Sequence, residues 1–245
     1  MNTTGNRYSR QLPLFGREGQ EKLADATIFI AGAGGLGSPV ATYLAMAGIG
    51  ELIIVDDDLV QESNLNRQFL HTNRNIGMRK VYSAAETLAA LNPDLTITAI
   101  PERITELTVE NQTGDADILV DATDNFETRY LLNKTAFQSG IPLVHGAVEG
   151  FSGQLTTILP GETPCLSCLF HKAPPERDTP VIGATAGVIG SLQAMEVIKY
   201  ITGSGRLIAG RLLIWDGLSG RSDYLTLSTR PDCPVCQTDH EEDCP

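Results

Sequence analysis

Four of the five cysteines form two Cys-x-x-Cys pairs, Cys165 with Cys168 and Cys233 with Cys236. Two such pairs supply four thiolates, a common ligand set for a tetrahedral Zn²⁺ ion. With all four positions taken by protein sulfur, such a site would hold the chain together and leave no place for a substrate. A redox-active Cys-x-x-Cys pair, or unconnected thiols, are the alternatives. The fifth cysteine, Cys244, lies in an acidic stretch and is expected to be a free thiol.

A glycine-rich segment, GAGGLG, matches the pattern G-x-G-x-x-G and follows a short apolar run. Its glycines are Gly32, Gly34, Gly35 and Gly37. Glycines here allow a tight turn and a close backbone approach, and a helix that begins here would direct N–H groups at a phosphate. Asp56 ends the next apolar run, where an acidic residue would bind ribose hydroxyls. The segment predicts a nucleotide site, but it does not separate NAD from ATP.

Polar residues downstream of Asp56 favour a triphosphate over a dinucleotide. Two amides and two cations follow it: Asn64, Arg67, Gln68 and Lys80. Cations so placed could hold the β- and γ-phosphates of ATP. Taken singly, Arg67 and Lys80 have the alternative interpretation of solvated surface charges. Together with the glycine segment, they favour ATP.

A carboxylate and an amide, Asp124 and Asn125, follow another apolar run at 117–122. In a parallel sheet this is the strand end at which ligands bind. A carboxylate that faces a triphosphate is a natural Mg²⁺ ligand, because Mg²⁺ bridges carboxylate and phosphate oxygens. The alternative for Asp124 is a helix N-cap. The combined pattern predicts a site for ATP and Mg²⁺.

The segments that must position these residues alternate between strand and helix. Strand-like runs cover 26–32, 51–55, 95–100, 117–122 and 142–146, and helical spacing covers 38–48, 78–91 and 126–140. Strand, helix and strand in this order predict a Rossmann-like, doubly wound α/β fold with a mostly parallel sheet. The glycine segment, Asp56 and Asp124 all follow predicted strands, so the fold would bring them to one edge of the sheet.

The pattern changes after about residue 150. Residues 154–159 alternate as an antiparallel strand would, a long helix follows at 183–201, and two strand-like runs lie at 212–215 and 224–227. We therefore expect an antiparallel C-terminal extension that a Cys₄ zinc site clips to the chain. The sequence shows no linker, so residues 1–245 are predicted to form a single domain, with a nucleotide-binding half at 1–150 and a second half at 151–245.

The composition excludes some classes of function. The 245 residues are 42% hydrophobic and 20% charged, which suits a sizeable core. The formal net charge of −12 argues against a nucleic-acid partner, because a nucleic-acid binder would have a basic surface. The N-terminus lacks a signal-peptide core, and no run reaches the roughly 18 apolar residues of a membrane span. With the paired cysteines, these features predict a cytoplasmic protein without a membrane partner.

Several longer motifs occur in a characteristic order: RYSRQ, GAGGLG, VDDDLVQESNLNRQFLH, MRK, DATDN, the two cysteine pairs and GVIGSLQAMEVIK. In these motifs, and over nearly its whole length, the chain resembles the MoeB/ThiF/HesA adenylyltransferases, bacterial relatives of the ubiquitin-activating enzymes. The motifs are most similar to those of the branch that adenylates molybdopterin synthase. Because so many motifs agree in order, the resemblance is specific.

The resemblance implies a reaction and a partner. A small ubiquitin-like sulfur-carrier protein that ends in Gly-Gly would attack the α-phosphate of ATP with its C-terminal carboxylate, giving an acyl-adenylate and pyrophosphate. Such carriers serve molybdenum or tungsten cofactor synthesis or thiamine-type sulfur transfer. The carrier would bind the second half, 151–245, with its tail in a channel beneath a mobile loop at 169–182.

The resemblance also implies roles for residues. The family's nucleotide site corresponds to Gly35, Asp56, Asn64, Arg67, Lys80, Asp124 and Asn125, and its zinc ligands to the four paired cysteines. Arg10, in RYSRQ, would reach the ATP of the neighbouring subunit in a homodimer. Asp124 would act through Mg²⁺. The cations Arg10, Arg67 and Lys80 would stabilise charge on the transferring phosphate and the leaving group.

The loop at 169–182 departs from that of some relatives. Those relatives carry a loop cysteine that bonds covalently to the activated carrier, whereas this loop contains none. The acyl-adenylate is already activated for attack by a sulfur donor, so no enzyme–carrier thioester is expected. No rhodanese-like extension follows the second cysteine pair, so the sulfur is expected to come from a separate donor protein.

Two other functions stay open at this point. An NAD(P)-dependent oxidoreductase would share the glycine segment, but it would need a separate substrate domain and would not need the clustered cations. A non-catalytic, zinc-clipped adaptor could bind a ubiquitin-like protein without activating it. Against the adaptor stands the complete set of Arg67, Lys80 and Asp124, since an adaptor has no use for these residues.

Overall fold

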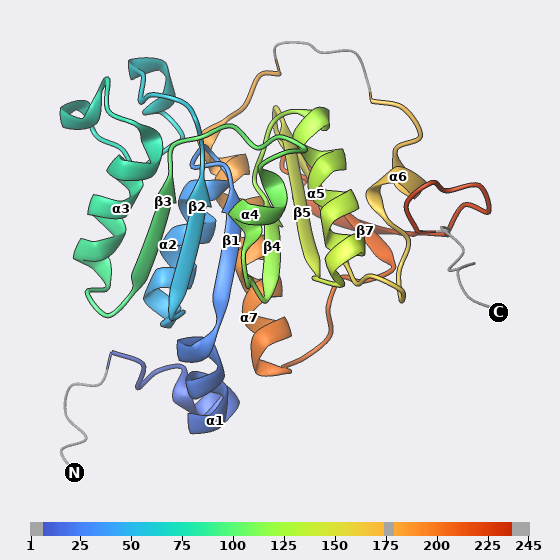
Figure 1. Ribbon diagram of the computed structural model, residues 1–245, viewed down its shortest axis with the longest axis horizontal. Helices are drawn as coiled ribbons and strands as arrows, with labels where there is room; N and C mark the ends of the chain where they lie inside the picture. The colour runs from blue at the N-terminus through green and yellow to red at the C-terminus, as the bar shows by residue number, and fades with distance from the viewer. Residues whose placement is uncertain (1–6, 174–178, 237–245) are drawn as a thin grey trace.

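The computed structural model describes residues 7–173 and 179–236, and its framework is an eight-stranded sheet with the order β3-β2-β1-β4-β5-β6-β7-β8 (Figure 1). The strands are β1 (Thr27–Ala31), β2 (Glu51–Val55), β3 (Thr96–Ile100), β4 (Ile118–Asp121), β5 (Leu143–Glu149), β6 (Ser152–Ile158), β7 (Arg211–Asp216) and β8 (Arg221–Thr226). Strands β1 to β5 pair in parallel, and β6 to β8 continue the sheet antiparallel. The predicted parallel sheet with an antiparallel extension is confirmed.

Both faces of the parallel strands are covered, which explains their apolar sequences. In β1, Ile28 and Ile30 lie in one core, whereas Phe29 and Ala31 lie in a second core on the opposite face. All four side chains are fully buried. Because successive side chains of a strand point to opposite faces, a strand that packs on both sides has to be apolar throughout. The short apolar run that predicted this strand is a consequence of its double burial.

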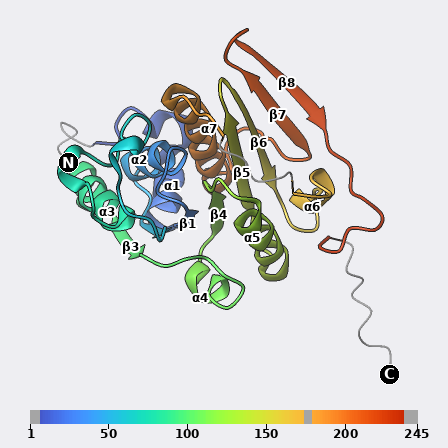
Figure 2. The ribbon, with the colours of Figure 1, turned by 90° about the horizontal axis from the view of Figure 1, so that it is seen from above.

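The helices form a layer on each side of the sheet (Figure 2). One layer holds α1 (Leu12–Asp25), α2 (Gly37–Ala47), α3 (Lys80–Leu91) and α7 (Gly183–Thr202); the other holds α4 (Val109–Thr113), α5 (Phe126–Ser139) and the short α6 (Leu166–Leu169). Two 3-10 turns lie at Glu62–Asn64 and Asn73–Asn75. Helix α7 belongs to the second half of the chain, yet Ile189, Ala194 and Val197 pack into the same core as β1 and β4.

Some elements differ from the sequence prediction. Helix α1 was not predicted, and Gly16 interrupts it with a φ of +71°, which splits it into two short helical pieces. The short helix α4, at Val109–Thr113, was also missed. Strand β8 spans Arg221–Thr226 instead of 224–227, and all its residues are exposed, so it lacks the alternating pattern of a half-buried strand.

Two regions named in the sequence predictions lie outside the described residues. One is Cys244, and the other is the stretch 174–178 of the loop that is predicted to cover the carrier's tail. The described flanks of that loop border the cleft discussed below, through Ala173, Thr179 and Val181. Within the described ranges, no helix is long and apolar enough to cross a membrane.

Candidate active site

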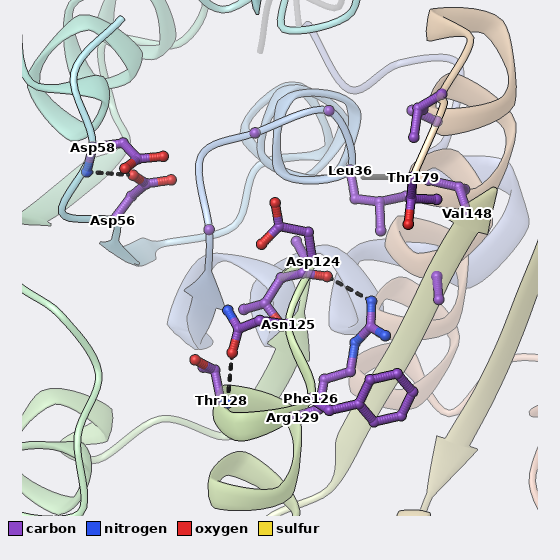
Figure 3. A pocket seen from close by; sticks show the side chains of 18 of the residues that line it. Leu36, Asp56, Asp58, Asp124, Asn125, Phe126, Thr128, Arg129, Val148 and Thr179 are labelled. Atoms are coloured by element: carbon purple, nitrogen blue, oxygen red, sulfur yellow. Dashed lines mark hydrogen bonds between the residues drawn. The ribbon is translucent and has the colours of Figure 1, made fainter. Parts of the chain in front are cut away.

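A cleft of about 1450 Å³ opens at the carboxyl ends of the parallel strands (Figure 3). It lies where the strand order reverses, between β1 and β4. Doubly wound sheets bind ligands at this reversal, because the chain connections leave the sheet in opposite directions there and open a crevice. The walls are the glycine turn, the loop after β2, the turn between β4 and α5, and the hairpin of β5 and β6.

Two close approaches shape the glycine turn. A Cβ on Gly32, whose φ is +100°, would lie 2.8 Å from the Ala122 carbonyl oxygen, and one on Gly37 would lie 2.0 Å from the Gly32 carbonyl oxygen. Both positions therefore need glycine to fold the turn against β4. Gly32, Gly34 and Gly35 line the cleft, while Gly37 does not. Gly34 and Gly35 thus offer the backbone that a phosphate could approach, just before α2 begins.

Asp56 closes the glycine turn onto the end of β2. Its Oδ2 accepts the Ala33 N–H at 2.8 Å, and its Oδ1 accepts the Asp58 N–H at 2.9 Å. Burial raises the pKa of Asp56, against the lowering effects of the Lys80 charge and of these two N–H groups. Lys80 is 6% exposed, and its Nζ lies 2.7 Å from Asp58 Oδ2 and 3.9 Å from Asp56 Oδ2. The cleft therefore holds this cation between two carboxylates.

The 3-10 turn Glu62–Asn64 brings Arg67 and Gln68 to the cleft wall. Asn64 Oδ1 accepts the Gln61 N–H at 3.0 Å, and Asn64 does not itself line the cleft, so its amide shapes the turn. Gln68 is 4% exposed, and its Oε1 has no hydrogen-bond partner in the described part of the chain. A buried acceptor without a partner costs about 1–3 kcal/mol. This oxygen is therefore suited to a donor on a bound ligand.

The turn after β4 leaves the Asp124 carboxylate available to a ligand. The neighbouring Asn125 Oδ1 accepts the Thr128 N–H at 2.8 Å and caps α5. The alternative interpretation of Asp124 as the helix cap is therefore wrong, since Asn125 has that role. No hydrogen bond to the Asp124 side chain occurs among the residues described, and its carboxylate points into the cleft (Figure 3).

The charges around the cleft suit a nucleotide with a divalent cation. The carboxylates of Asp56, Asp58 and Asp124 border it, together with the cations of Arg67 and Lys80. Carboxylates and phosphates that converge on one cleft repel one another unless cations lie between them. Mg²⁺ commonly joins one or two protein carboxylates to substrate phosphates. The donor set of this cleft fits ATP bound with Mg²⁺.

Two remote parts of the chain bring four cysteines together. Cys165 and Cys168 lie at α6, and Cys233 and Cys236 follow β8. Their sulfur atoms all lie within 4.8 Å of one another, with 3.5 Å between Cys165 and Cys233 and 3.3 Å between Cys168 and Cys236. Zn–S bonds of about 2.3 Å in a tetrahedron separate the sulfur atoms by about 3.8 Å. The cluster is compatible with a four-coordinate zinc ion.

The surroundings of the cluster favour a thiolate at Cys233, whereas burial raises the pKa of Cys165 and of Cys236. Burial acts to raise the pKa of Cys233, but bonds from the Cys236 and Val235 N–H groups and from neighbouring thiols outweigh it and lower the pKa to about 7. The Arg230 N–H donates to Cys168 Sγ at 3.4 Å. The described cysteines are free thiols, not disulfides. Metal ligation needs deprotonated sulfur, so these bonds suit a metal.

Comparison with known proteins assigns the chain to a family. The sequence model described as "ThiF family" matches residues 8–235. The chain belongs to the ThiF family. The resemblance to the MoeB/ThiF/HesA proteins is thereby confirmed.

Two proteins that are similar to this chain are named for the activation or adenylylation of another protein. The chain is 42% identical to the "SAMP-activating enzyme E1" of Haloferax volcanii, over 94% of this chain and 88% of that protein. It is 43% identical to the "Sulfur carrier protein adenylyltransferase" of Thermus thermophilus, over 94% of this chain and 90% of that protein. A crystal structure of E. coli MccB with ATP is similar in fold, with a TM-score of 0.86, 26% identity, and coverage of 95% of this chain and 75% of that one.

Arg10 lies away from the cleft of its own subunit. Arg10 is exposed and does not line the cleft. Helix α1, which begins shortly after it at Leu12, lies at the amino ends of the strands, whereas the cleft lies at their carboxyl ends (Figure 1). If Arg10 contacts a nucleotide, the nucleotide therefore has to belong to another subunit.

Sequence reasoning missed a pair of buried polar residues behind the cleft. Asp121 ends β4 and His145 lies in β5, both are fully buried, and His145 Nδ1 lies 2.7 Å from Asp121 Oδ2. The only signal in the sequence is a polar residue at the end of each of two apolar runs, DILVDA and PLVHG. Nothing local joins these residues, because only the pairing of β4 with β5 brings them together.

Proposed function

We propose that this ThiF-family chain uses ATP to adenylate the C-terminal glycine of a small ubiquitin-like sulfur-carrier protein. The names of the two similar proteins from Haloferax and Thermus support this activity. The observation that carries the proposal is the Asp124 carboxylate, which is free of side-chain bonds among the described residues and shares one cleft with the glycine turn, Arg67 and Lys80. An NAD(P)-dependent oxidoreductase or a non-catalytic adaptor would not need this combination.

ATP would bind with its phosphates over the glycine turn. Gly34 and Gly35 allow the closest approach, and Arg67 and Lys80 supply positive charge beside it. Asp56 already accepts two N–H groups, but a carboxylate has about four lone-pair sites, so it can also accept ribose hydroxyls. Asn64 would support this site indirectly through its turn.

The carrier's terminal carboxylate would attack the α-phosphate of ATP. A bond forms between the carboxylate oxygen and this phosphorus, the bond to the β-phosphate oxygen breaks, and pyrophosphate leaves with its electron pair. No proton has to move, because the carboxylate is ionised at neutral pH. Mg²⁺, when bound, would neutralise phosphate charge, with Asp124 as the protein residue that holds it. Arg67 and Lys80 would stabilise the leaving pyrophosphate.

The carrier's tail would enter on the side of the β5–β6 hairpin. Small side chains line that side, among them Ala147, Val148, Ser152 and Gly153. They leave room for an extended Gly-Gly tail, and Val181 borders the same side. On the outer strand β8, Leu225 is about half exposed and lies on the same sheet face as Ile214, which lines the cleft. This apolar face beside the cleft supports docking of the folded part of the carrier there.

We also propose that the cysteine cluster holds a structural zinc ion and that a separate protein donates the sulfur. Zinc ligation would occupy Cys165, Cys168, Cys233 and Cys236, so none of these would act as a free nucleophile. The carrier would then serve molybdenum or tungsten cofactor synthesis or thiamine-type sulfur transfer, in the cytoplasm. Since the loop at 169–182 has no cysteine, the reaction would stop at the acyl-adenylate.

The active unit would be a homodimer in which Arg10 serves the partner's nucleotide. A shallow apolar groove of about 520 Å³ runs over α2 and α7. Its lining includes Tyr43, Phe69 and Met195, whose exposed fractions are 48%, 52% and 53%. Large apolar side chains that gather on one face in this way support a subunit interface.

Mixing two inactive variants should restore activity if Arg10 acts in trans. Arg10→Ala and Asp124→Ala should each be inactive as homodimers. After subunit exchange, half of the dimers are mixed, and each mixed dimer has one site with both residues intact, so about a quarter of wild-type activity should return. Pyrophosphate exchange measures it. No recovery, despite subunit exchange proven by mass spectrometry, would contradict the role in trans.

The proposed activity predicts which nucleotide stabilises the protein. ATP with Mg²⁺ at about 100 times its dissociation constant should add about 2.7 kcal/mol to the free energy of unfolding, which raises Tm by roughly 5–10 °C. NADH at the same concentration should leave Tm unchanged. With a carrier that ends in Gly-Gly, the chain should exchange labelled pyrophosphate into ATP. Stabilisation by NADH without any exchange would instead favour an oxidoreductase.

A further inference from the structure

Buried polar side chains lie directly behind the turn that carries Asp124. Asp121, His145 and Gln193 are fully buried, and Arg129 is 7% exposed. The roles proposed above for ATP, Mg²⁺ and the carrier use none of them. Burial of charged and polar groups costs free energy unless their hydrogen bonds are satisfied. The presence of these four polar side chains inside the protein therefore needs an explanation.

The bonds of Asp121 fix the main chain of the turn. Its Oδ1 accepts the N–H and the hydroxyl of Thr123, at 3.0 and 2.6 Å. Gln193 Nε2, from α7, donates to the Asp121 carbonyl oxygen at 2.7 Å, and Arg129, from α5, donates to the Thr123 carbonyl oxygen at 2.8 Å. Helices α5 and α7, together with the side chain of Asp121 itself, thus hold residues 121–123. The next residue along the chain is Asp124.

His145 supplies the donor that keeps Asp121 in place. Its Nδ1 lies 2.7 Å from Asp121 Oδ2, and Arg129 Nε lies 3.6 Å from the same oxygen without a hydrogen bond. Burial lowers the pKa of His145. Burial acts to raise the pKa of Asp121, but the bond from His145 and the Arg129 charge outweigh it and lower the pKa. A neutral His145 therefore donates its Nδ1 proton to an ionised Asp121.

The second ring nitrogen of His145 faces the cleft wall. His145 Nε2 lies 3.4 Å from Gln154 Nε2, and Gln154 lines the cleft. With the proton on Nδ1, Nε2 is an acceptor and Gln154 donates to it. One imidazole thus joins the turn after β4 to the β5–β6 side of the cleft. Phe170 packs against the ring at 6.2 Å between centroids.

We propose that Asp121 and His145 form a positioning pair, which holds the Asp124 carboxylate at the place where catalysis requires it. The inference rests on the proposed adenylation reaction. Among the described residues Asp124 has no side-chain hydrogen bond, so its neighbours set its position. Asn125 fixes one side through the α5 cap, and the pair fixes the other side through Thr123. Neither member of the pair touches the substrate.

Stability alone is a weak explanation for this pair. Buried ionic groups commonly stabilise a fold no better than well-packed apolar residues of the same volume. The bonds of this pair end on the cleft wall, where a displacement of about 1 Å can cost about 10²-fold in rate. Partners that orient a metal ligand from behind commonly cost about 10–100-fold in metal affinity or activity when they are removed.

Two substitutions of His145 test the pair. His145→Leu fills the buried space of the imidazole with an apolar side chain but removes the hydrogen-bond donor to Asp121. His145→Asn retains an N–H near the position of Nδ1. Pyrophosphate exchange should fall about 10–100-fold in His145→Leu, the Mg²⁺ concentration for half-maximal exchange should rise, and the carrier's KM should stay close to that of the wild type. His145→Asn should restore most of the rate and of the Mg²⁺ response.

A matched control separates this role from lost stability. Thr157→Val removes another buried hydrogen bond, from the Thr157 hydroxyl to Glu196 Oε2 at 2.6 Å, at the end of β6 away from the cleft. It should lower Tm without changing the Mg²⁺ response. In parallel, ¹⁵N NMR of the wild type should show the His145 ring as the neutral Nδ1–H tautomer, assigned by its absence in His145→Asn.

Each outcome decides for or against the pair. Wild-type kinetics in His145→Leu, or equal losses in His145→Asn and His145→Leu, would overturn it. If His145→Leu does not fold, His145→Asn and the tautomer still decide: an Nε2–H or charged ring contradicts the pair. A wild-type protein that exchanges no pyrophosphate with any Gly-Gly carrier would refute the proposed function instead, and the tautomer measurement would still test the bond to Asp121.

Discussion

Asp124→Ala is expected to lower carrier-dependent pyrophosphate exchange by about 10²-fold or more. The carboxylate is the one proposed to hold Mg²⁺ against the phosphates, and nothing else in the turn replaces it, since Asn125 is committed to the α5 cap. Because the Asp124 side chain makes no hydrogen bond within the described part of the chain, Tm should stay within about 1–2 °C of the wild type. Steady-state exchange and a thermal melt measure both effects.

The control for Asp124→Ala is a carboxylate outside the cleft. Glu106 is an exposed residue that pairs with Lys134 at 2.7 Å and does not line the cleft. Glu106→Gln should keep wild-type exchange, because exposed ion pairs contribute little and this one is remote from the phosphates. Undiminished exchange in Asp124→Ala would remove the residue from the proposed mechanism.

Removal of the proposed zinc ion should give the largest loss of stability. A strong chelator, or Cys233→Ser, should lower Tm by roughly 10 °C or more, because a lost structural metal costs several kcal/mol and each kcal/mol shifts Tm by about 2–4 °C in a chain of this size. Elemental analysis of the wild type should find one zinc ion per chain. Cys233 is almost fully buried. The serine hydroxyl that replaces its thiol in Cys233→Ser is a poor zinc ligand, and no other ligand can enter so closed a site.

Cys244→Ser is the matched control for the cluster. It removes a thiol that belongs to neither Cys-x-x-Cys pair, so zinc content and Tm should not change. The same variant should also keep its activity if no enzyme–carrier thioester forms. A freshly purified wild-type protein that contains a disulfide and no metal would contradict the zinc proposal.

The parallel strands β1 to β5 could be predicted because the sequence signals for them are local. The doubly buried β1 has to be apolar throughout, and the φ of +100° at Gly32 favours glycine through the local backbone conformation alone. The same holds for the cysteine pairs, whose spacing within each pair is set by the metal. These features appear in the sequence within a few residues of one another. Residues that contact these features from distant parts of the sequence give no such local signal.

Other parts of the site depend on contacts across the sheet. Asp121 and His145 are 24 residues apart, and only the register of β4 against β5 shows that they pair. Sequence reasoning also left open whether Asp124 binds a ligand or caps α5, because an aspartate at this position suits either role. Helix α1 was not predicted, and it is interrupted locally by the positive φ of Gly16. Tertiary packing alone brings Asp121 and His145 together.

The position of α7 has a consequence for synthesis of the chain on the ribosome. All five parallel strands are complete at Glu149, but the core on one of their faces also needs Ile189, Ala194 and Val197. Until those residues emerge, β1 and β4 would expose an apolar face, and the nascent chain would be a partly covered intermediate prone to aggregation. A fragment that ends near residue 150 should therefore require a chaperone or form inclusion bodies. Folding of residues 1–150 has to await helix α7, which lies later in the chain.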